Sequence, residues 1–330
     1  MKAFILSNPK SVKDALQLLA VARDSKQAKA IQPLAGGQDL LTEMKEHLAE
    51  PDRLVNLKGI AELDYLRNLD GKVQIGALAT LARMEKNNLL NEHARVLFEA
   101  AHSIASPQIR SVGTIGGNLN QRPRCLYYRL EEANCLKKGG KECFAYSGMN
   151  RYNAILGGGP SYIVHPSDLA PALIALDATV FIAGRTGPRE MPLESYYKLP
   201  SVGDVRTETV REPDELLLSV SFQLPAPGTR STYLKFKERE SYDFALASVA
   251  LVLGFDGDVI RHARLVLGGV APVPWRVRAA EAALVGQKAD TQTAEKAAEL
   301  ALAGAVPLSG NAFKIPLTKS LIVRAIRSLA

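Results

Sequence analysis

Two glycine-rich loops constrain the fold of this chain more than any other feature. The first, PLAGGQDL, covers Pro33 to Leu40, and the second, SVGTIGGNL, covers Ser111 to Leu119. Glycines in such loops let successive backbone N–H groups point into one concavity, and a following helix adds partial positive charge, which together suit a pyrophosphate. Neither loop has the G-x-G-x-x-G spacing of a Rossmann site. A Gly-Gly turn alone is most often only a turn, but two such loops favour a dinucleotide held across two modules.

The apolar pattern around these loops predicts three successive units, over residues 1–57, 58–225 and 226–330. The first unit has expected strands at 2–9, 28–37 and 52–57, with helices between them, and Ser11 and Asp14 suit the start of the first helix. The second unit combines strands at 72–79 and 214–224 with a helical stretch over 81–104, and contains an inserted cysteine loop over 121–162. The third unit follows a proline-marked linker. It has strands at 231–238, 245–255 and 261–270 and helices at 276–284, 293–302 and 317–329.

Composition excludes several classes of protein. The net charge of +7 comes from 41 basic residues interspersed with 34 acidic ones, and aromatic residues are only 6%, so nucleic-acid binding is not expected. No run of eighteen apolar residues occurs, so no membrane-spanning helix is expected. Three cysteines are too few for a disulfide scaffold. We therefore expect a cytoplasmic protein.

Four segments in this order resemble a known family: PLAGGQDLL, QIGALATL, IASPQIRSVGTIGGNL and HPSDLAPALIALDA. The chain resembles the FAD-binding medium subunit of the molybdenum hydroxylases, the family of xanthine dehydrogenase, aldehyde oxidase and carbon monoxide dehydrogenase. The resemblance extends over essentially the whole chain. It implies an α+β fold, in which two subdomains of the vanillyl-alcohol-oxidase type clasp FAD. A C-terminal α+β domain with an antiparallel sheet and helices follows them.

The resemblance implies an oxidoreductase subunit that transfers electrons and is not a complete catalyst. A large molybdenum-cofactor subunit would oxidise the substrate, a small [2Fe–2S] subunit would pass electrons to FAD, and an external acceptor would receive them. The complex would be a heterotrimer or a dimer of heterotrimers. One alternative is a stand-alone flavin-dependent oxidase or reductase of the same fold. Another is an iron–sulfur or zinc interaction module with no flavin.

No catalytic side chain is implied, because the protein supplies binding and electrostatics to the cofactor. Asp168 would accept a hydrogen bond from a ribose or ribityl hydroxyl, although it also suits a helix N-cap. Leu217 would pack near the isoalloxazine, with Lys237 and Asp243 as a polar element beside it. The other implied FAD contacts are Leu34, Ala35, Gly36, Gly37, Gln38, Asp39 and Leu40 at the pyrophosphate, Ile75, Ala77 and Thr80 at the adenine side, and Ala105, Ser106, Gly113, Thr114, Gly116, Gly117 and Asn118 at the phosphates and ribityl chain.

All three cysteines of the chain, Cys125, Cys135 and Cys143, lie in one basic segment. Their C-x9-C and C-x7-C spacings differ from the close pairs of zinc sites, whereas iron–sulfur clusters tolerate wider loops. A subset of the family, including 4-hydroxybenzoyl-CoA reductase and certain bacterial aldehyde oxidoreductases, carries a similar insertion that binds a [4Fe–4S] cluster through four cysteines. These three cysteines match three of the ligands, and Ser161 aligns with the fourth. Serine oxygen is a harder ligand than thiolate. The options are a [4Fe–4S] cluster completed by Ser161 or water, a [3Fe–4S] cluster, or a bare loop.

Overall fold

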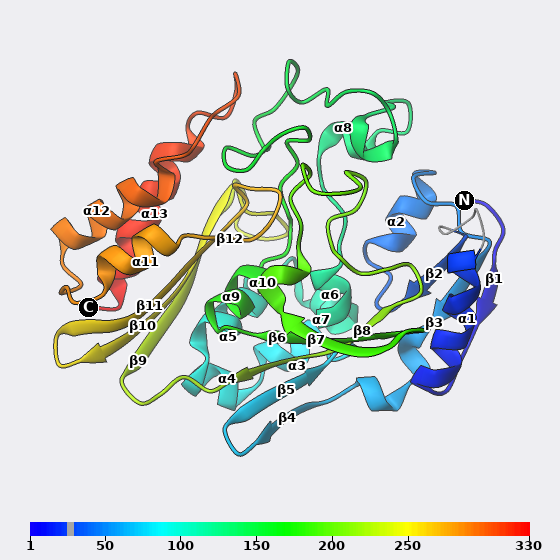
Figure 1. Ribbon diagram of the computed structural model, residues 1–330, viewed down its shortest axis with the longest axis horizontal. Coiled ribbons are helices and arrows are strands. Elements are labelled where there is room, and N and C mark those ends of the chain that lie inside the picture. Colours follow the sequence, from blue (N-terminus) through cyan, green and yellow to red (C-terminus); the bar gives the residue numbers. More distant parts are fainter. Residues whose placement is uncertain (25–29) are drawn as a thin grey trace.

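The computed structural model describes residues 1–24 and 30–330, which form three sheets (Figure 1). The first sheet is parallel with the order β1-β3-β2 and consists of β1 (Ile5–Ser7), β3 (Arg53–Asn56) and β2 (Ile31–Leu34). Helices α1 (Val12–Asp24) and α2 (Leu40–Lys45) connect these strands. Ser11 Oγ accepts a hydrogen bond from the Asp14 backbone N–H at 3.1 Å, as the sequence predicted. Residues 28 and 29 of the expected second strand lie outside the described residues.

The second sheet has the order β4-β5-β8-β6-β7 and is antiparallel throughout. Its strands are β4 (Leu66–Leu69), β5 (Lys72–Gly76), β8 (Leu216–Gln223), β6 (Thr179–Gly184) and β7 (Gly187–Pro192). The sequence predicted neither edge strand. β4 is largely exposed and β7 is exposed at every second residue, so neither carries the apolar pattern of a buried strand.

Short helices surround this second sheet. The stretch expected to be helical over 81–104 is divided into α3 (Leu81–Glu85), α4 (Asn88–His93) and α5 (Arg95–His102). The break between α3 and α4 has a local cause. The Asn87 side chain caps α4 by accepting from the Leu90 N–H at 3.1 Å, so a new helix begins there. The remaining helical elements of this part are η1 (Leu57–Gly59), η2 (Ala61–Leu63), α6 (Pro107–Val112), α7 (Ile115–Leu119), α8 (Leu126–Arg129), η3 (Leu136–Lys138), α9 (Leu169–Ala175) and α10 (Leu193–Tyr196).

The third sheet is antiparallel with the order β12-β11-β10-β9. It consists of β9 (Thr229–Phe236), β10 (Ala247–Asp256), β11 (Val259–Gly268) and β12 (Trp275–Arg276), followed by α11 (Arg278–Leu284), α12 (Thr291–Leu302) and α13 (Lys314–Ser328). Strand β10 is buried on both faces. Val249 and Leu251 pack into the core shared with the C-terminal helices, whereas Ala250 and Val252 pack into the core of the central unit. The third sheet is thereby joined firmly to the central unit of the chain.

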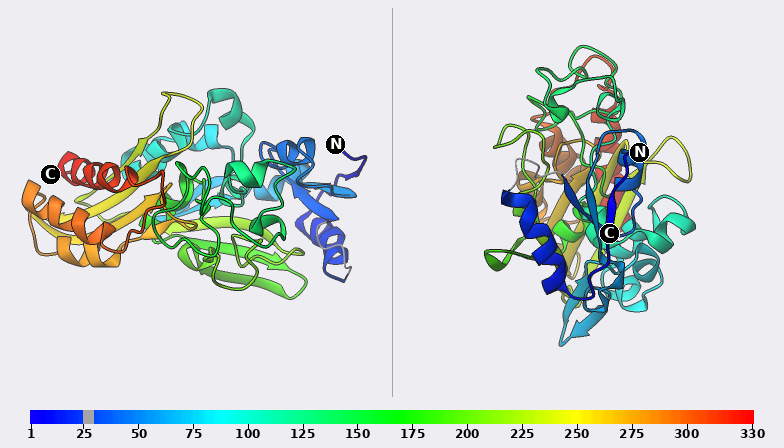
Figure 2. Two further views of the ribbon diagram at one scale, coloured as in Figure 1. Left: turned by 90° about the horizontal axis from the view of Figure 1, so that it is seen from above. Right: turned by 90° about the vertical axis from the view of Figure 1, so that its right-hand side faces the viewer.

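Figure 2 shows the N-terminal unit at one end of an elongated molecule and the C-terminal helices at the other. The segment from α8 to the start of α9, which contains the cysteines, lies between them along one edge (Figure 1). The expected α+β fold, with a C-terminal domain of antiparallel sheet and helices, is confirmed. Within the described part of the chain, none of the helices combines the length and apolarity that a membrane span requires.

Candidate functional site

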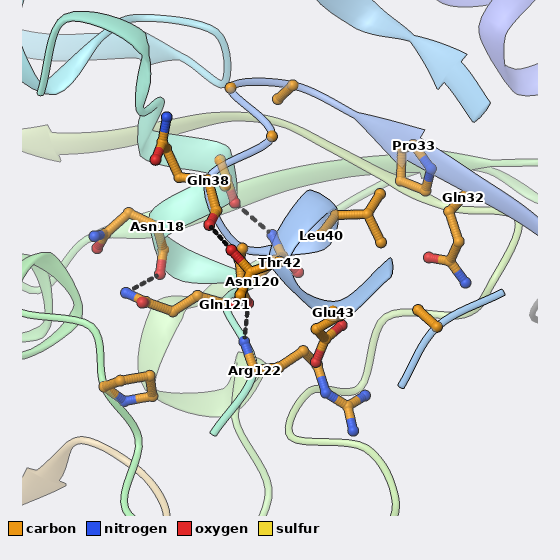
Figure 3. A pocket seen from close by; sticks show the side chains of 18 of the residues that line it. Gln32, Pro33, Gln38, Leu40, Thr42, Glu43, Asn118, Asn120, Gln121 and Arg122 are labelled. Atoms are coloured by element: carbon orange, nitrogen blue, oxygen red, sulfur yellow. Dashed lines mark hydrogen bonds between the residues drawn. The ribbon is translucent and has the colours of Figure 1, made fainter. Parts of the chain in front are cut away.

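A cleft of about 1170 Å³ opens between the three units. Its walls are the loop after β2, the turn between α6 and α7, the start of α9, the first residues of β8 and the connection between β9 and β10. Figure 3 shows Gln38 of the first loop beside Asn118, Asn120 and Gln121 at the end of α7. The cleft exceeds the range of about 300–1,000 Å³ typical of drug-sized ligands, so its size suits a dinucleotide.

Most of the residues expected to contact FAD line this cleft. They come from segments up to about 180 residues apart, and the fold brings them to one surface. The residues are Leu34, Ala35, Gly36, Gly37, Gln38, Asp39, Leu40, Ala77, Ala105, Gly113, Thr114, Gly116, Gly117, Asn118, Asp168 and Leu217.

Four expected contacts, Ile75, Thr80, Ser106 and Lys237, are not among the residues that line the cleft. The Ile75 side chain is fully buried in the core of the central unit. Thr80 and Ser106 cap α3 and α6 through their side-chain oxygens, so they support the cleft loops indirectly. Lys237 comes directly after the end of β9.

The glycines of the two loops serve mainly to bring the loops together. A Cβ on Gly36 would lie 2.2 Å from the carbonyl oxygen of Val112, and a Cβ on Gly116 would lie 2.9 Å from that of Ala77. Gly37 has a φ of +78°, a conformation that glycine adopts without strain. The contact of Gly36 with Val112 joins the two loops into one floor of the cleft, and Gly116 packs the second loop against Ala77.

Asp168 is buried, and each of its carboxylate oxygens has a partner. Its Oδ2 forms an ion pair with Lys235 Nζ at 2.8 Å, and its Oδ1 accepts from the Tyr233 hydroxyl at 2.6 Å. The side chain makes no capping hydrogen bond, so the helix-cap interpretation of Asp168 is wrong. Ser167 Oγ accepts from the Ala170 N–H instead, and its hydroxyl donates to Asn118 at 2.6 Å.

The resemblance implied Lys237 as a polar element beside the flavin. Lys235, two residues earlier, holds the Asp168 carboxylate, a contact that the sequence did not predict. Tyr233 and Lys235 lie on one face of β9 because side chains two residues apart in a strand point the same way. The strand ends at Phe236, so this alternation does not continue to Lys237. The signal that could have identified Lys235 was this two-residue period together with Tyr233.

The connection between β9 and β10 brings an aromatic element to the cleft that sequence reasoning missed. Tyr242 and Phe244 line the cleft and are 60% and 44% exposed, and the guanidinium of Arg124 lies 4.9 Å from the centre of the Phe244 ring. Tyr242 has a φ of +55° and its N–H donates to the carbonyl of Ala105, which has a φ of +44°. Positive φ at two non-glycine residues is strained, and such strain concentrates at functional sites. Asp243, between the aromatic residues, accepts from the backbone N–H groups of its own loop.

A cluster of charged side chains joins the first glycine loop to the cysteine segment. Asp39 accepts from the Arg122 backbone N–H at 2.6 Å and from Arg129 at 2.8 Å, and it lies 3.0 Å from Arg124. The Tyr128 hydroxyl donates to Glu43 at 2.7 Å. Burial raises the pKa of both groups, which favours their protonated forms. The individual residues gave no sign of this arrangement in the sequence.

The three cysteines and Ser161 all line a second, small cavity of about 10 Å³. The thiols are free, and Ser161 Oγ is buried with no hydrogen-bond partner among the described residues. No group of three His, Cys, Asp or Glu side chains in residues 1–24 and 30–330 is placed to hold one metal ion. The donor set fits an iron–sulfur cluster, which distributes its ligands around several iron atoms. The cavity volume is that of a single water, so a cluster requires the surrounding segments to separate.

Comparisons with known proteins cover both parts of the chain. Residues 2–227 match the family described as the FAD binding domain in molybdopterin dehydrogenase, and residues 231–329 match the CO dehydrogenase flavoprotein C-terminal domain. The aldehyde oxidoreductase FAD-binding subunit PaoB of Escherichia coli is 35% identical over 300 residues, 89% of each chain. The carbon monoxide dehydrogenase medium chain of Afipia carboxidovorans is 30% identical over 93% of this chain and 88% of that one. A chain of the reconstituted CO dehydrogenase from Oligotropha carboxidovorans superposes with a TM-score of 0.77 at 28% identity, covering 98% of this chain and 96% of that chain.

Proposed function

The chain belongs to the FAD-binding subunits of the molybdenum hydroxylases, and we propose that it carries electrons through FAD held in the cleft between its three units. The observation that carries this proposal is the match of two family models to residues 2–227 and 231–329, together with the dinucleotide-sized cleft. No observation favours the alternative of a stand-alone flavin oxidase or reductase.

The residues of the cleft fit FAD in size, backbone geometry and charge. We assign the pyrophosphate to the joined glycine loops, where Gly37 and Gly117 expose their backbone to the cleft. Arg124 also lines the cleft, and its Nε is buried without a hydrogen-bond partner in the described chain, so it offers a positive charge and a free donor to an anion. We assign the isoalloxazine end to Leu217 and the Tyr242–Phe244 loop. FAD, when bound, supplies the capacity to accept and release electrons.

We propose that this chain works in a complex with a large molybdenum-cofactor subunit and a small [2Fe–2S] subunit, as a heterotrimer or a dimer of heterotrimers. The external electron acceptor would receive electrons at the flavin. The surface of the cysteine segment supports a partner there, because Leu126, Tyr146 and Met149 each leave more than half of their area exposed. We also place the complex in the cytoplasm, since three free thiols are typical of a reducing compartment.

We further propose an iron–sulfur cluster, [4Fe–4S] or [3Fe–4S], in the cysteine segment, held by Cys125, Cys135 and Cys143 with Ser161 or water as a further ligand. The convergence of these four side chains on one cavity supports it. Such a cluster, when bound, supplies a one-electron carrier. Residues 1–57 and 58–225 would then be the two FAD subdomains, with the cluster segment 121–162 inserted in the second, and residues 226–330 the C-terminal domain.

The FAD assignment is tested by changing Asn118 to Asp. Asn118 belongs to the second glycine loop and lines the cleft, so a carboxylate there would repel the pyrophosphate. We expect FAD affinity to fall at least about tenfold. The same change at Asn91, an exposed residue of α4, is the matched control and leaves FAD binding intact. Full flavin occupancy in Asn118→Asp, measured by titrating flavin-free protein, contradicts the assignment.

The cluster is tested by iron analysis after anaerobic purification. We expect roughly three to four iron atoms per flavin. Cys135→Ala removes the iron, and Ser161→Cys makes the cluster more resistant to oxygen because a soft ligand replaces a hard or absent one. Iron-free protein with full flavin and three titratable thiols would establish the bare loop instead.

A further inference from the structure

Two side chains, Tyr128 and Lys137, line both the flavin cleft and the cysteine cavity. They form a shared wall between the two sites. Both are almost completely buried, with 5% and 3% of their surface exposed. A shift of either side chain therefore changes both sites at once.

Each wall residue lies within one helical turn of a cysteine. Cys125 is the N-cap residue of α8, which carries Tyr128, and the Arg129 N–H donates to the Cys125 carbonyl at 3.0 Å. Cys135 is the N-cap residue of η3, which carries Lys137. Displacement of either thiol tilts a short, hydrogen-bonded turn, so it moves the wall residue as well.

On the flavin side, each wall residue is bound to a buried carboxylate. The Tyr128 hydroxyl donates to Glu43 at 2.7 Å, and Lys137 forms an ion pair with Glu208. Glu43 lines the cleft, and Glu208 lies between the cleft residues Thr207 and Thr209. The two glutamates are 6% and 7% exposed. Breaking such a buried contact would leave a polar group without a partner, which costs free energy. Each wall residue and its carboxylate therefore move together.

Glu43 connects Tyr128 to the first glycine loop, which we assign to the pyrophosphate. It lies in α2, where the Glu43 N–H donates to the Asp39 carbonyl and the Leu41 N–H donates to the Gly37 carbonyl. The position of α2 therefore sets the position of Gly37, whose backbone faces the cleft.

We propose that Tyr128 and Lys137 are positioning residues that couple the cysteine cavity to FAD affinity. Ligation or modification of the thiols shifts the two short turns, the turns shift Glu43 and Glu208, and the glycine loop changes its fit to FAD. Because coupling is reciprocal, FAD in turn restrains the cysteine segment. The inference rests on the proposed FAD site in the cleft.

A double-mutant cycle on the full-length, flavin-stripped chain tests the coupling, with FAD dissociation constants as the readout. We expect Tyr128→Phe to weaken FAD binding about tenfold, because it cuts the link to Glu43, and Cys125→Ala to weaken it about threefold. The double variant should bind FAD no more weakly than Tyr128→Phe alone, since the link is already cut. Tyr127→Phe is the matched control: it lies in the same helix, lines only the cysteine cavity, and accepts from the Met149 N–H at 2.7 Å. It should leave FAD affinity unchanged.

A second measurement needs no variant. Cys143 and Phe144 line the cysteine cavity and not the flavin cleft, and their carbonyls accept from the N–H groups of Tyr146 and Gly148. Hydrogen exchange of these two amides should slow several-fold when FAD is added to the wild-type chain. Unchanged exchange, unchanged FAD affinity in Cys125→Ala, or effects that multiply in the double variant would overturn the coupling. A wild-type chain that binds no FAD would overturn the proposed site as well.

Discussion

Replacing Asp168 by Asn separates a structural role of this carboxylate from a role in binding FAD. The ammonium group of Lys235, whose side chain is 3% exposed, has Asp168 as its charged partner at 2.8 Å. Removing one partner of a buried ion pair costs about 3–5 kcal/mol. The asparagine oxygen can still accept from Lys235, and its amide N–H can donate to the Tyr233 hydroxyl, so we expect the lower value, about 3 kcal/mol, in urea unfolding.

The double variant Asp168→Asn/Lys235→Met removes the uncompensated charge, so about 2 kcal/mol of the lost unfolding free energy should be regained. If Asp168 also accepts from a flavin hydroxyl, as we propose, FAD affinity should be about tenfold low in both the single and the double variant, because the charged acceptor is absent from each. If stability and FAD affinity return together, Asp168 acts on the flavin only through the fold.

Asp177→Asn is the control, since Asp177 lies just beyond the other end of α9 and its half-exposed carboxylate pairs with Arg264 and Arg276. Exposed pairs are worth at most about 1 kcal/mol. The reasoning is refuted if Asp168→Asn costs no more than this control, or if the double variant is as unstable as Asp168→Asn.

Three further predictions follow from individual contacts. Gly36→Ala should prevent correct folding, because its Cβ would lie 2.2 Å from a carbonyl oxygen, whereas Gly117→Ala, whose Cβ meets only a hydroxyl at 3.2 Å, should fold and lose FAD affinity. Equal yields of folded protein from the two variants would contradict this. Burial lowers the pKa of His165 to about 3, so the unfolded chain binds a proton between pH 6.5 and 3 that the folded chain does not. Stability should therefore fall by up to about 5 kcal/mol as the pH drops through this range, and His165→Gln should flatten the profile in urea titrations. Lys314→Met should cost about 3 kcal/mol, because the buried ammonium donates to three backbone carbonyls at 2.8–3.1 Å. Lys319→Met, in the same helix, should cost under about 1 kcal/mol, because this partly exposed lysine pairs only with the exposed Glu299. A similar loss in both variants would argue against the buried contacts.

The sequence by itself determined the order of the elements and the loops between them. Short apolar runs predicted β9, β10 and β11, and Ser11 marked the start of α1, because these signals depend only on neighbours along the chain. The glycine loops could be predicted as one site from their composition and from the resemblance to a family. The edge strands β4 and β7 escaped prediction, since an exposed strand needs no apolar period.

Only the tertiary structure decided which polar groups meet. The ion pair of Lys235 with Asp168 depends on which face of β9 meets the start of α9. The contact between Tyr128 and Glu43 joins residues 85 positions apart, and no local pattern encodes such a pair. The spacing of apolar residues specifies which side of a strand or helix is buried, but the partner on that side depends on how distant segments pack. For this reason the sequence could indicate a flavin cleft and a cysteine segment, whereas the shared wall between them emerged only when the chain was folded.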